Sequence, residues 1–267
     1  MAHKDMKWSS AGTDWLGGSI MTGEKMKKSM NPTLSLWALL ARCSIYKVLA
    51  VLVIMAMVEV VLFYHCLKSD VEYYTLARAV KDSLLSVIFL AAFGLVCFAL
   101  AWTERRLDTE SEAAMQRLRL SGSRIFMIKT AYNIACIVIL FAVQIWLAIG
   151  LVEIYGREME EIYASPQRLF LAFYRIGFLH CLLPMAEVGK WVRNLLLLLA
   201  FGMEAAGGSE KAERKYYVPL IPLYVVTTSC FVSSMGGNAI DLVCGIVYTV
   251  VIAVNIWQMW RVQREEM

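Results

Sequence analysis

The chain has 267 residues, of which 59% are hydrophobic and 18% charged, with a formal net charge of +4 and a mean hydropathy of +0.58. Soluble domains contain about a quarter charged residues and about half apolar ones, so this balance excludes a soluble enzyme or a nucleic-acid-binding module for the whole chain. At least five apolar runs could cross a hydrocarbon core of about 30 Å, which needs about 20 helical residues. The composition predicts an all-α polytopic protein embedded in membrane lipids.

The start of the chain differs from the rest. Residues 1–30 are polar and lack the apolar core of a secretory signal, which predicts a disordered cytoplasmic tail ahead of a membrane domain over residues 31–267. Asn31, Pro32 and Thr33 are typical of a helix start. Residues 34–47 then alternate apolar with polar and basic side chains, which predicts an interfacial helix before the first crossing.

Polar segments divide the remaining sequence into membrane spans. These are a hairpin at residues 68–82, a strongly charged stretch at 103–129 and an acidic loop at 153–168. Six transmembrane helices are expected, at residues 48–67, 83–102, 131–151, about 191–206, 217–234 and 239–259.

The number of spans depends on the segment at residues 169–187, which is apolar but contains Arg175, His180 and Pro184. If it does not cross, both termini lie on the side that holds 18 of the 26 lysines and arginines. The positive-inside rule makes that side cytoplasmic. We therefore expect residues 169–187 to be an amphipathic or re-entrant helix on the outer face.

Seven cysteines lie scattered among the apolar runs, with no C-x-x-C pair. An odd number at such spacings gives neither a disulfide framework nor a zinc site. We interpret all seven as small hydrophobic residues in lipid or helix contacts.

The sequence offers no catalytic set. It has no H-E-x-x-H motif, and its three histidines are too far apart for a metal site. Gly18 to Lys25 imitates a phosphate-binding loop, but a glutamate precedes the lysine and no apolar strand leads into it. We expect no metal, no bound cofactor and no enzymatic activity in this chain.

The charged stretch after the second predicted span reads ERRLDTESEAAMQRLRLSGSRIFMIK. It resembles the cytoplasmic loop of permease subunits of second-type ABC exporters. In that family a Glu-Arg pair closes the second span, a short helix follows, a leucine and a small-residue break come next, and a lysine opens the third span. The matching positions here are Glu104 and Arg105, then Leu118, then 121–123, then Lys129. Asp108 stands where the family has a glycine, and Ser121 where it has a proline.

The resemblance implies a permease subunit of an exporter in the cell inner membrane. Its loop would be a coupling helix held by a separate ABC ATPase subunit, which would bind the ATP and Mg. Two permease chains, identical or paired with a sister chain, would enclose the path. The residues expected to couple to the partner are Glu104, Arg105, Arg106, Leu118, Arg119 and Lys129.

A second hypothesis, which assigns the chain to a different class of membrane protein, stays open. The charged helix could belong to a membrane adaptor or sensor that transports nothing and recruits a cytoplasmic partner. The helix could also simply lie on anionic lipid through its arginines. A partner ATPase distinguishes transport from these alternatives.

Polar residues inside the spans are candidates for the translocation path. A charge exposed to lipid at Glu59 would cost at least about 2.5 kcal/mol, so Glu59 should face the bundle, carry a proton or find a partner. Glu59, Gln144 and Asn255 could line a path, or Gln144, Asn255 or Thr227 could be the structural partner of Glu59.

Two residues of the outer segment, Arg175 and His180, could form an outer gate. The alternative is that their side chains lie at the level of the lipid headgroups.

Overall fold

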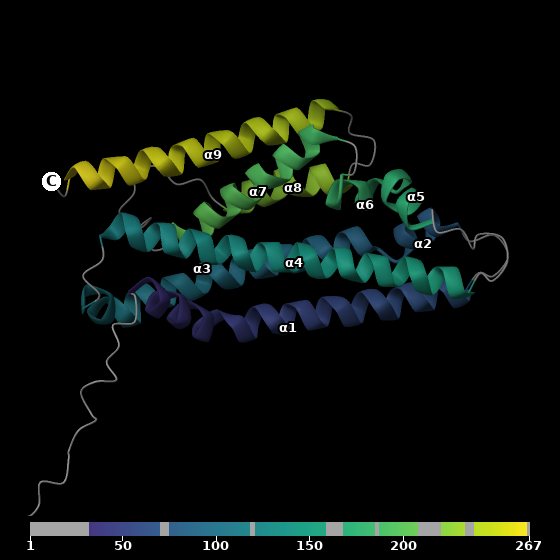
Figure 1. The fold of residues 1–267 in the computed structure, drawn as a ribbon, viewed down its shortest axis with the longest axis horizontal. Helices are drawn as coiled ribbons and strands as arrows, with labels where there is room; N and C mark the ends of the chain where they lie inside the picture. The colour runs from purple at the N-terminus through teal and green to yellow at the C-terminus, as the bar shows by residue number, and fades with distance from the viewer. Residues whose placement is uncertain are drawn as a thin grey trace, which may run out of the picture. The chain divides into compact units, whose positions relative to one another are not determined.

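The structure is a computed structural model that describes residues 32–69, 75–117, 121–158, 168–184, 187–207, 220–232 and 238–265. Regular structure within these ranges is α-helical throughout (Figure 1). The predicted tail at residues 1–30 lies outside the described residues, as do Leu118 and Arg119.

Six longer helices and three short ones follow one another along the described chain. The longer helices are α1 (Pro32–Ser69), α3 (Leu85–Arg117), α4 (Gly122–Glu158), α7 (Val188–Ala206), α8 (Leu220–Val232) and α9 (Asn238–Glu265). The short helices are α2 (Leu76–Asp82), α5 (Arg168–Arg175) and α6 (Gly177–Leu182).

Four helices are long and apolar enough to cross a membrane, which confirms the prediction of an all-helical membrane protein. The apolar segments are Thr33–Lys68 in α1, Leu85–Thr103 in α3, Gly122–Arg157 in α4 and Ala239–Arg261 in α9, with mean hydropathies from 2.2 to 2.7. The predicted fourth and fifth spans fall on α7 and α8, which are not among these four. Helix α7 carries three charged residues, and α8 has 13 residues in its described length.

Helix α1 is longer than the sequence predicts. Its 38 residues correspond to about 57 Å, nearly twice the hydrocarbon thickness. The backbone is helical across the expected boundary between residues 34–47 and 48–67, and no glycine or proline follows Pro32 within α1. The polar Ser44 does not interrupt the helix either, since its hydroxyl donates to the Leu40 carbonyl oxygen at 2.9 Å.

Helix α7 lies at the centre of the packing. It contacts α3, α4, α8 and α9, while α1 packs on α3 and α4 (Figure 1). Helices α7 and α9 run in the same direction, because Arg193 meets Asp241 near the start of both helices and Glu204 meets Asn255 further along. The second half of α7 is buried without interruption from Ala200 to Ala206.

Aromatic rings fill the centre of the bundle. The Phe89 ring of α3 lies 5.3 Å from Phe141 of α4, 5.8 Å from Phe178 of α6 and 5.7 Å from Phe231 of α8. These edge-to-face and tilted contacts join four helices in one core.

The apolar segment that follows residues 159–167 is a broken helix. Helix α5 ends at Arg175 and α6 begins at Gly177, with the extended residue Ile176 between them. At eight and six residues, neither piece could cross a membrane. Buried Phe173 and Phe178 anchor the two pieces to one end of the bundle.

Candidate functional site

The charged stretch at residues 103–129, here called the elbow, is largely a continuation of α3. The helix passes the end of its apolar segment at Thr103 and continues to Arg117, so Glu104, Arg105 and Arg106 lie on helical backbone. The short coupling helix expected from the resemblance is therefore an extension of the preceding helix. Helix α4 begins within the elbow at Gly122, and the Ser121 carbonyl oxygen accepts from the Arg124 amide at 3.0 Å.

The base of the elbow is fixed to α1. The Lys47 ammonium donates to the Thr103 hydroxyl oxygen at 3.0 Å, and that hydroxyl donates to the Ala99 carbonyl oxygen at 2.7 Å. Thr103 is 4% exposed and Lys47 is exposed, so this contact joins α1 and α3 at the edge of the bundle, at the residue where the charged extension begins.

The last predicted coupling residue, Lys129, lies inside the bundle rather than on its surface. Its side chain is 4% exposed, and the next residue, Thr130, is also buried. Lys129 therefore does not present a free cation to a partner in this structure. Arg124, one turn from the start of α4, is exposed. Arg124 was not singled out from the sequence, although its position directly after the small-residue break at 121–123 was a usable signal.

A group of buried polar residues, here called the inner polar cluster, links α4, α7 and α9 and is made of Asn133, Glu204 and Asn255. Asn133 of α4 donates its Nδ2 to the Gly202 carbonyl oxygen of α7 at 3.4 Å. Asn255 of α9 donates its Nδ2 to Glu204 Oε2 of α7 at 3.1 Å. The start of α4 is thus tied through α7 to α9.

A glycine allows this close approach of α4 and α7. A Cβ placed on Gly202 would lie 2.5 Å from Ile134 Cγ1, which is closer than real carbon contacts permit. The absence of a side chain at Gly202 therefore sets the spacing at which the Asn133 bond forms.

The polar residues predicted inside the spans form separate pairs and do not share one hydrogen-bonded group. Glu59 of α1 and Gln144 of α4 lie together, both 0% exposed, with Gln144 Nε2 donating to Glu59 Oε2 at 3.0 Å. Asn255 instead pairs with Glu204, and the Thr227 hydroxyl lies 2.9 Å from the Tyr248 hydroxyl. Of the three partners considered for Glu59, the structure selects Gln144.

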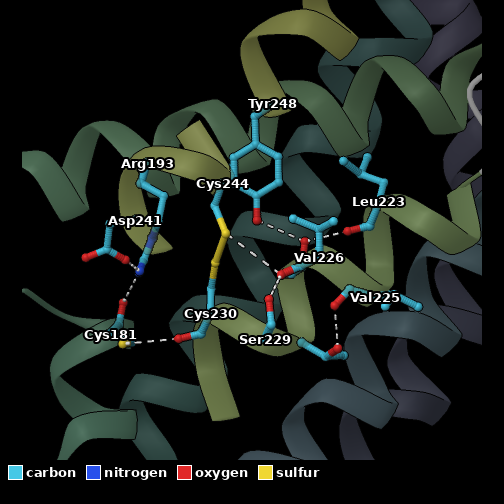
Figure 2. The surroundings of a disulfide bond; sticks show 12 residues. Cys181, Arg193, Leu223, Val225, Val226, Ser229, Cys230, Asp241, Cys244 and Tyr248 are labelled. Atoms are coloured by element: carbon cyan, nitrogen blue, oxygen red, sulfur yellow. Dashed lines mark hydrogen bonds and ion pairs between the residues drawn. A yellow bond between two sulfur atoms is a disulfide. The ribbon is translucent and has the colours of Figure 1, made fainter. Parts of the chain in front are cut away.

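A second polar group, here called the outer polar cluster, is centred on Arg193 of α7, which is 2% exposed (Figure 2). Its guanidinium pairs with the Asp241 carboxylate of α9 and donates to Asn194 Oδ1 at 2.9 Å. The Cys181 carbonyl oxygen of α6 accepts from Arg193 Nη2 at 3.4 Å and from Asn194 Nδ2 at 3.0 Å. The cluster holds α6, α7 and α9 together.

A disulfide lies beside the outer polar cluster. Cys230, near the end of α8, is bonded to Cys244, in the second turn of α9 (Figure 2). The prediction that all seven cysteines are unpaired is wrong for these two. The two consecutive spans expected at residues 217–234 and 239–259 already allowed these cysteines to lie close together, but we interpreted them only from the odd total and the absence of a C-x-x-C pair. The other five cysteines are free thiols.

The two outer-gate candidates have different surroundings. Arg175 is exposed at the end of α5, whereas His180 Nε2 lies 3.3 Å from Glu187 Oε1. Lys190 Nζ lies 2.9 Å from the other Glu187 oxygen. The pKa of Glu187 is lowered from its ordinary value of 4.5, chiefly by the hydrogen bond from Lys190 and further by His180, against a smaller opposing effect of burial.

An open apolar groove of about 610 Å³ runs along α1 and α4. Val60 lines one side, and Trp146, Leu147 and Gly150 lie on the other. Trp146 is 81% exposed. This lining suits lipid chains and offers no polar group to a hydrophilic ligand.

Over the part of the chain that the structure describes, no group of three His, Cys, Asp or Glu side chains is arranged to hold a metal ion. Comparisons with protein-family models, with curated proteins and with solved structures gave no match. The function is therefore argued from the residues of this chain.

Proposed function

We propose that this chain is the permease subunit of an ATP-driven exporter of the second ABC type. The observation that carries the proposal is the elbow, in which a charged helix extends α3 beyond its apolar segment to Arg117 and α4 begins five residues later at Gly122. A permease without an ATPase site needs a stiff element through which a partner can move its helices. A helix continuous with a membrane span transmits such a displacement better than a flexible loop.

Six membrane crossings fit the helix order. In Figure 1, helices α1, α3, α4, α7, α8 and α9 traverse the bundle in alternating directions, and the start of α1, the elbow and the end of α9 share one end. The charges of α7 are compatible with a crossing, because Arg193 and Glu204 are buried against partners on α9 rather than exposed to lipid.

The disulfide supports the orientation. Cys230 and Cys244 join the last part of α8 to the first part of α9, and α9 begins at the end of the bundle opposite the start of α4 (Figure 1). Disulfides persist in oxidising compartments and are rare in the cytosol. The disulfide end would therefore face outward and the elbow inward, which agrees with the bias of basic residues toward the elbow side.

In this proposal the partner ATPase binds the ATP and Mg, and this chain performs no covalent chemistry. Closure of two ATPase subunits would push the elbow, and the inner polar cluster would pass the displacement from α4 to α7 and α9. A second permease chain, identical or a sister, would complete the path. Arg175 and His180 remain candidates for its outer gate.

Co-purification from the native membrane tests the proposal. The tagged wild type should retain an ATPase subunit, and the double variant Glu104→Ala, Arg105→Ala should lose at least about 90% of it. The matched control is Glu153→Ala, Arg157→Ala, which removes an exposed acid-arginine pair at the other end of α4 and should retain the ATPase.

Two results would contradict the proposal. One is an ATPase that stays bound to the elbow variant as well as to the control. The other is a wild type that brings down a cytoplasmic protein without nucleotide-hydrolysing activity, which would favour the membrane adaptor.

A further inference from the structure

The contact between Glu59 and Gln144 is incomplete as it stands. Gln144 Nε2 donates to Glu59 Oε2 at 3.0 Å, and both side chains are 0% exposed. The two remaining oxygens, Glu59 Oε1 and Gln144 Oε1, are buried and have no hydrogen-bond partner. A buried polar atom without a partner is destabilising, so we expect a hydrogen-bond donor for these two oxygens.

The chemistry of the two groups identifies the missing donor. A carboxylate only accepts hydrogen bonds, and a carboxamide oxygen also only accepts, so the two free oxygens cannot satisfy each other. A carboxylic acid differs by one proton, and its hydroxyl donates. A protonated Glu59 could donate from Oε1 to Gln144 Oε1 while Gln144 Nε2 donates to Glu59 Oε2.

We propose that Glu59 and Gln144 form a proton-binding site inside the membrane, occupied at neutral pH as a reciprocal carboxylic acid–carboxamide pair. One bound proton converts two unsatisfied acceptors into one hydrogen bond. The site is neutral when occupied, which suits its position between two apolar helices.

The described surroundings of Glu59 supply no cation and no second hydrogen-bond donor that would stabilise a buried carboxylate. Among the described residues, Gln144 is the hydrogen-bond partner of Glu59, and no cation pairs with it. On α1, the basic residues nearest to Glu59 are the exposed His65, Lys68 and Lys47, which are six, nine and twelve residues away, or about 9, 14 and 18 Å along the helix.

The helices packed against α1 are α2, α3 and α4. On α2, Arg78, Lys81 and Asp82 are exposed, and Arg78 pairs with Asp82. The other titratable groups described on these helices are Cys97 of α3 and Arg124, Lys129, Tyr132, Cys136, Glu153, Tyr155 and Arg157 of α4. None of them hydrogen-bonds to Glu59 within the described ranges.

Proton release should loosen the contact between α1 and α4. The ionised pair would lose one of two hydrogen bonds and leave a charge between apolar helices. Because the folded protein would hold this proton to higher pH than the unfolded chain does, the stabilisation is complete at low pH and disappears as the pH rises. The inference stands on the geometry of this pair and does not depend on the proposed transport function.

Infrared spectroscopy of the full-length protein in nanodiscs tests the site directly. The wild type at pH 7 should show the carbonyl band of a buried protonated carboxyl, and Glu59→Gln should remove it. The matched control, Glu187→Gln, removes a carboxyl that is partly exposed and ion-paired, and should leave the band in place. A wild type without this band at pH 7 would overturn the proposal.

A thermal unfolding series from pH 5 to 9 provides a second readout that needs no variant spectrum. Glu59→Gln keeps a reciprocal amide pair, so its melting should lack the pH-dependent contribution. The wild-type folding constant should fall relative to that of Glu59→Gln by up to about tenfold per pH unit once the proton dissociates from the unfolded chain. Identical pH profiles, or a wild type stabilised by added Na⁺ or K⁺ in place of protons, would also overturn the proposal.

Discussion

Helices α1 and α7 differ in length, in the charges they carry and in how many of their polar side chains are buried against other helices. Helix α1 has 38 residues, and large apolar side chains such as Val53, Ile54 and Met57 are exposed, where lipid would cover them. Helix α7 has 19 residues and three charges, and Arg193 and Glu204 are about 2% exposed. The exposed surface of both helices is apolar, as Leu195 at 57% exposure shows for α7, but the buried side of α7 also carries charged groups that neighbouring helices cover.

This difference explains which helices hydropathy detects. A helix that faces lipid must be apolar over most of its surface, so its sequence reports its environment. A helix enclosed by others may carry polar groups wherever neighbours supply partners. Charges in α7 are therefore compatible with a central position, and its stability should depend on particular contacts more than that of α1.

The largest expected effect comes from removing the guanidinium of the outer polar cluster. Arg193→Ala would leave the partly buried Asp241 carboxylate without its cation and Asn194 Oδ1 without the donor that Arg193 supplies. We expect a loss of about 3–5 kcal/mol in unfolding free energy, measured by chemical denaturation in detergent. The double variant Arg193→Met, Asp241→Leu should recover most of that loss, because no uncompensated charge remains.

The control is Arg175→Ala, which removes an exposed arginine from α5. If Arg193→Ala and Arg175→Ala were equally mild, α7 would not depend on its buried contacts as the comparison with α1 requires.

The next largest effect concerns the disulfide between α8 and α9. Cys230→Ser removes a cross-link that closes a loop of 14 residues, for which we expect a loss of about 3 kcal/mol under non-reducing conditions. Cys43→Ser, which replaces an exposed free thiol of α1, should have little effect. Alkylation of the unreduced, unfolded protein followed by mass spectrometry should leave Cys230 and Cys244 unmodified, and modification of both would show that the bond does not form.

Alanine substitutions at two glycines test the close contact between α4 and α7. Gly202 lies at that contact, and Gly150 of α4 lies away from it. Gly202→Ala should destabilise the protein by about 1–3 kcal/mol, because its Cβ would overlap Ile134 Cγ1. Gly150→Ala places a Cβ where nothing lies within 4 Å, and alanine favours helix, so it should stabilise by up to about 1 kcal/mol. Equal melting temperatures for both variants would contradict the packing of α4 on α7.

The smallest expected effect is a pH dependence at the start of α7. The lowered pKa of Glu187 means that its contacts with Lys190 and His180 stabilise the fold above the ordinary value of 4.5, and that this contribution disappears as the pH falls through the lowered pKa. Glu187 is partly exposed, so the contribution should be about a few tenths of a kcal/mol. Glu187→Gln should flatten the melting profile between pH 6 and 3, and an unchanged profile would show that the contacts carry no net energy.

The sequence predicted the helices that are apolar along most of their length, as contact with lipid requires. The apolar runs in α1, α3, α4 and α9 were visible because each is long and nearly free of charge. The continuation of α3 to Arg117 was not predicted, because the second span was expected to end at residue 102 and a separate short helix to follow it. The continuity of α1 was missed, because an amphipathic start was interpreted as a separate helix although nothing in the chain breaks it.

The pairings inside the bundle could not be predicted in the same way. Arg193 and Asp241 are 48 residues apart, and Glu204 and Asn255 are 51 apart. Their contacts depend on which helices are neighbours, and a single sequence does not determine this order. Glu59 was recognised as needing a partner because of its depth in an apolar run, yet three partners were equally compatible until α4 was found beside α1.

The central claim is that α7 crosses the membrane despite its charges, which sets the six-span topology. Single cysteines introduced by Val188→Cys, at the exposed start of α7, and Glu213→Cys, beyond its end, can be labelled with a membrane-impermeant maleimide in a Cys43→Ser, Cys66→Ser background. The account predicts that the cysteine at 188 reacts in intact cells and that the cysteine at 213 reacts only after the membrane is opened. Labelling of both positions from the same side would contradict it.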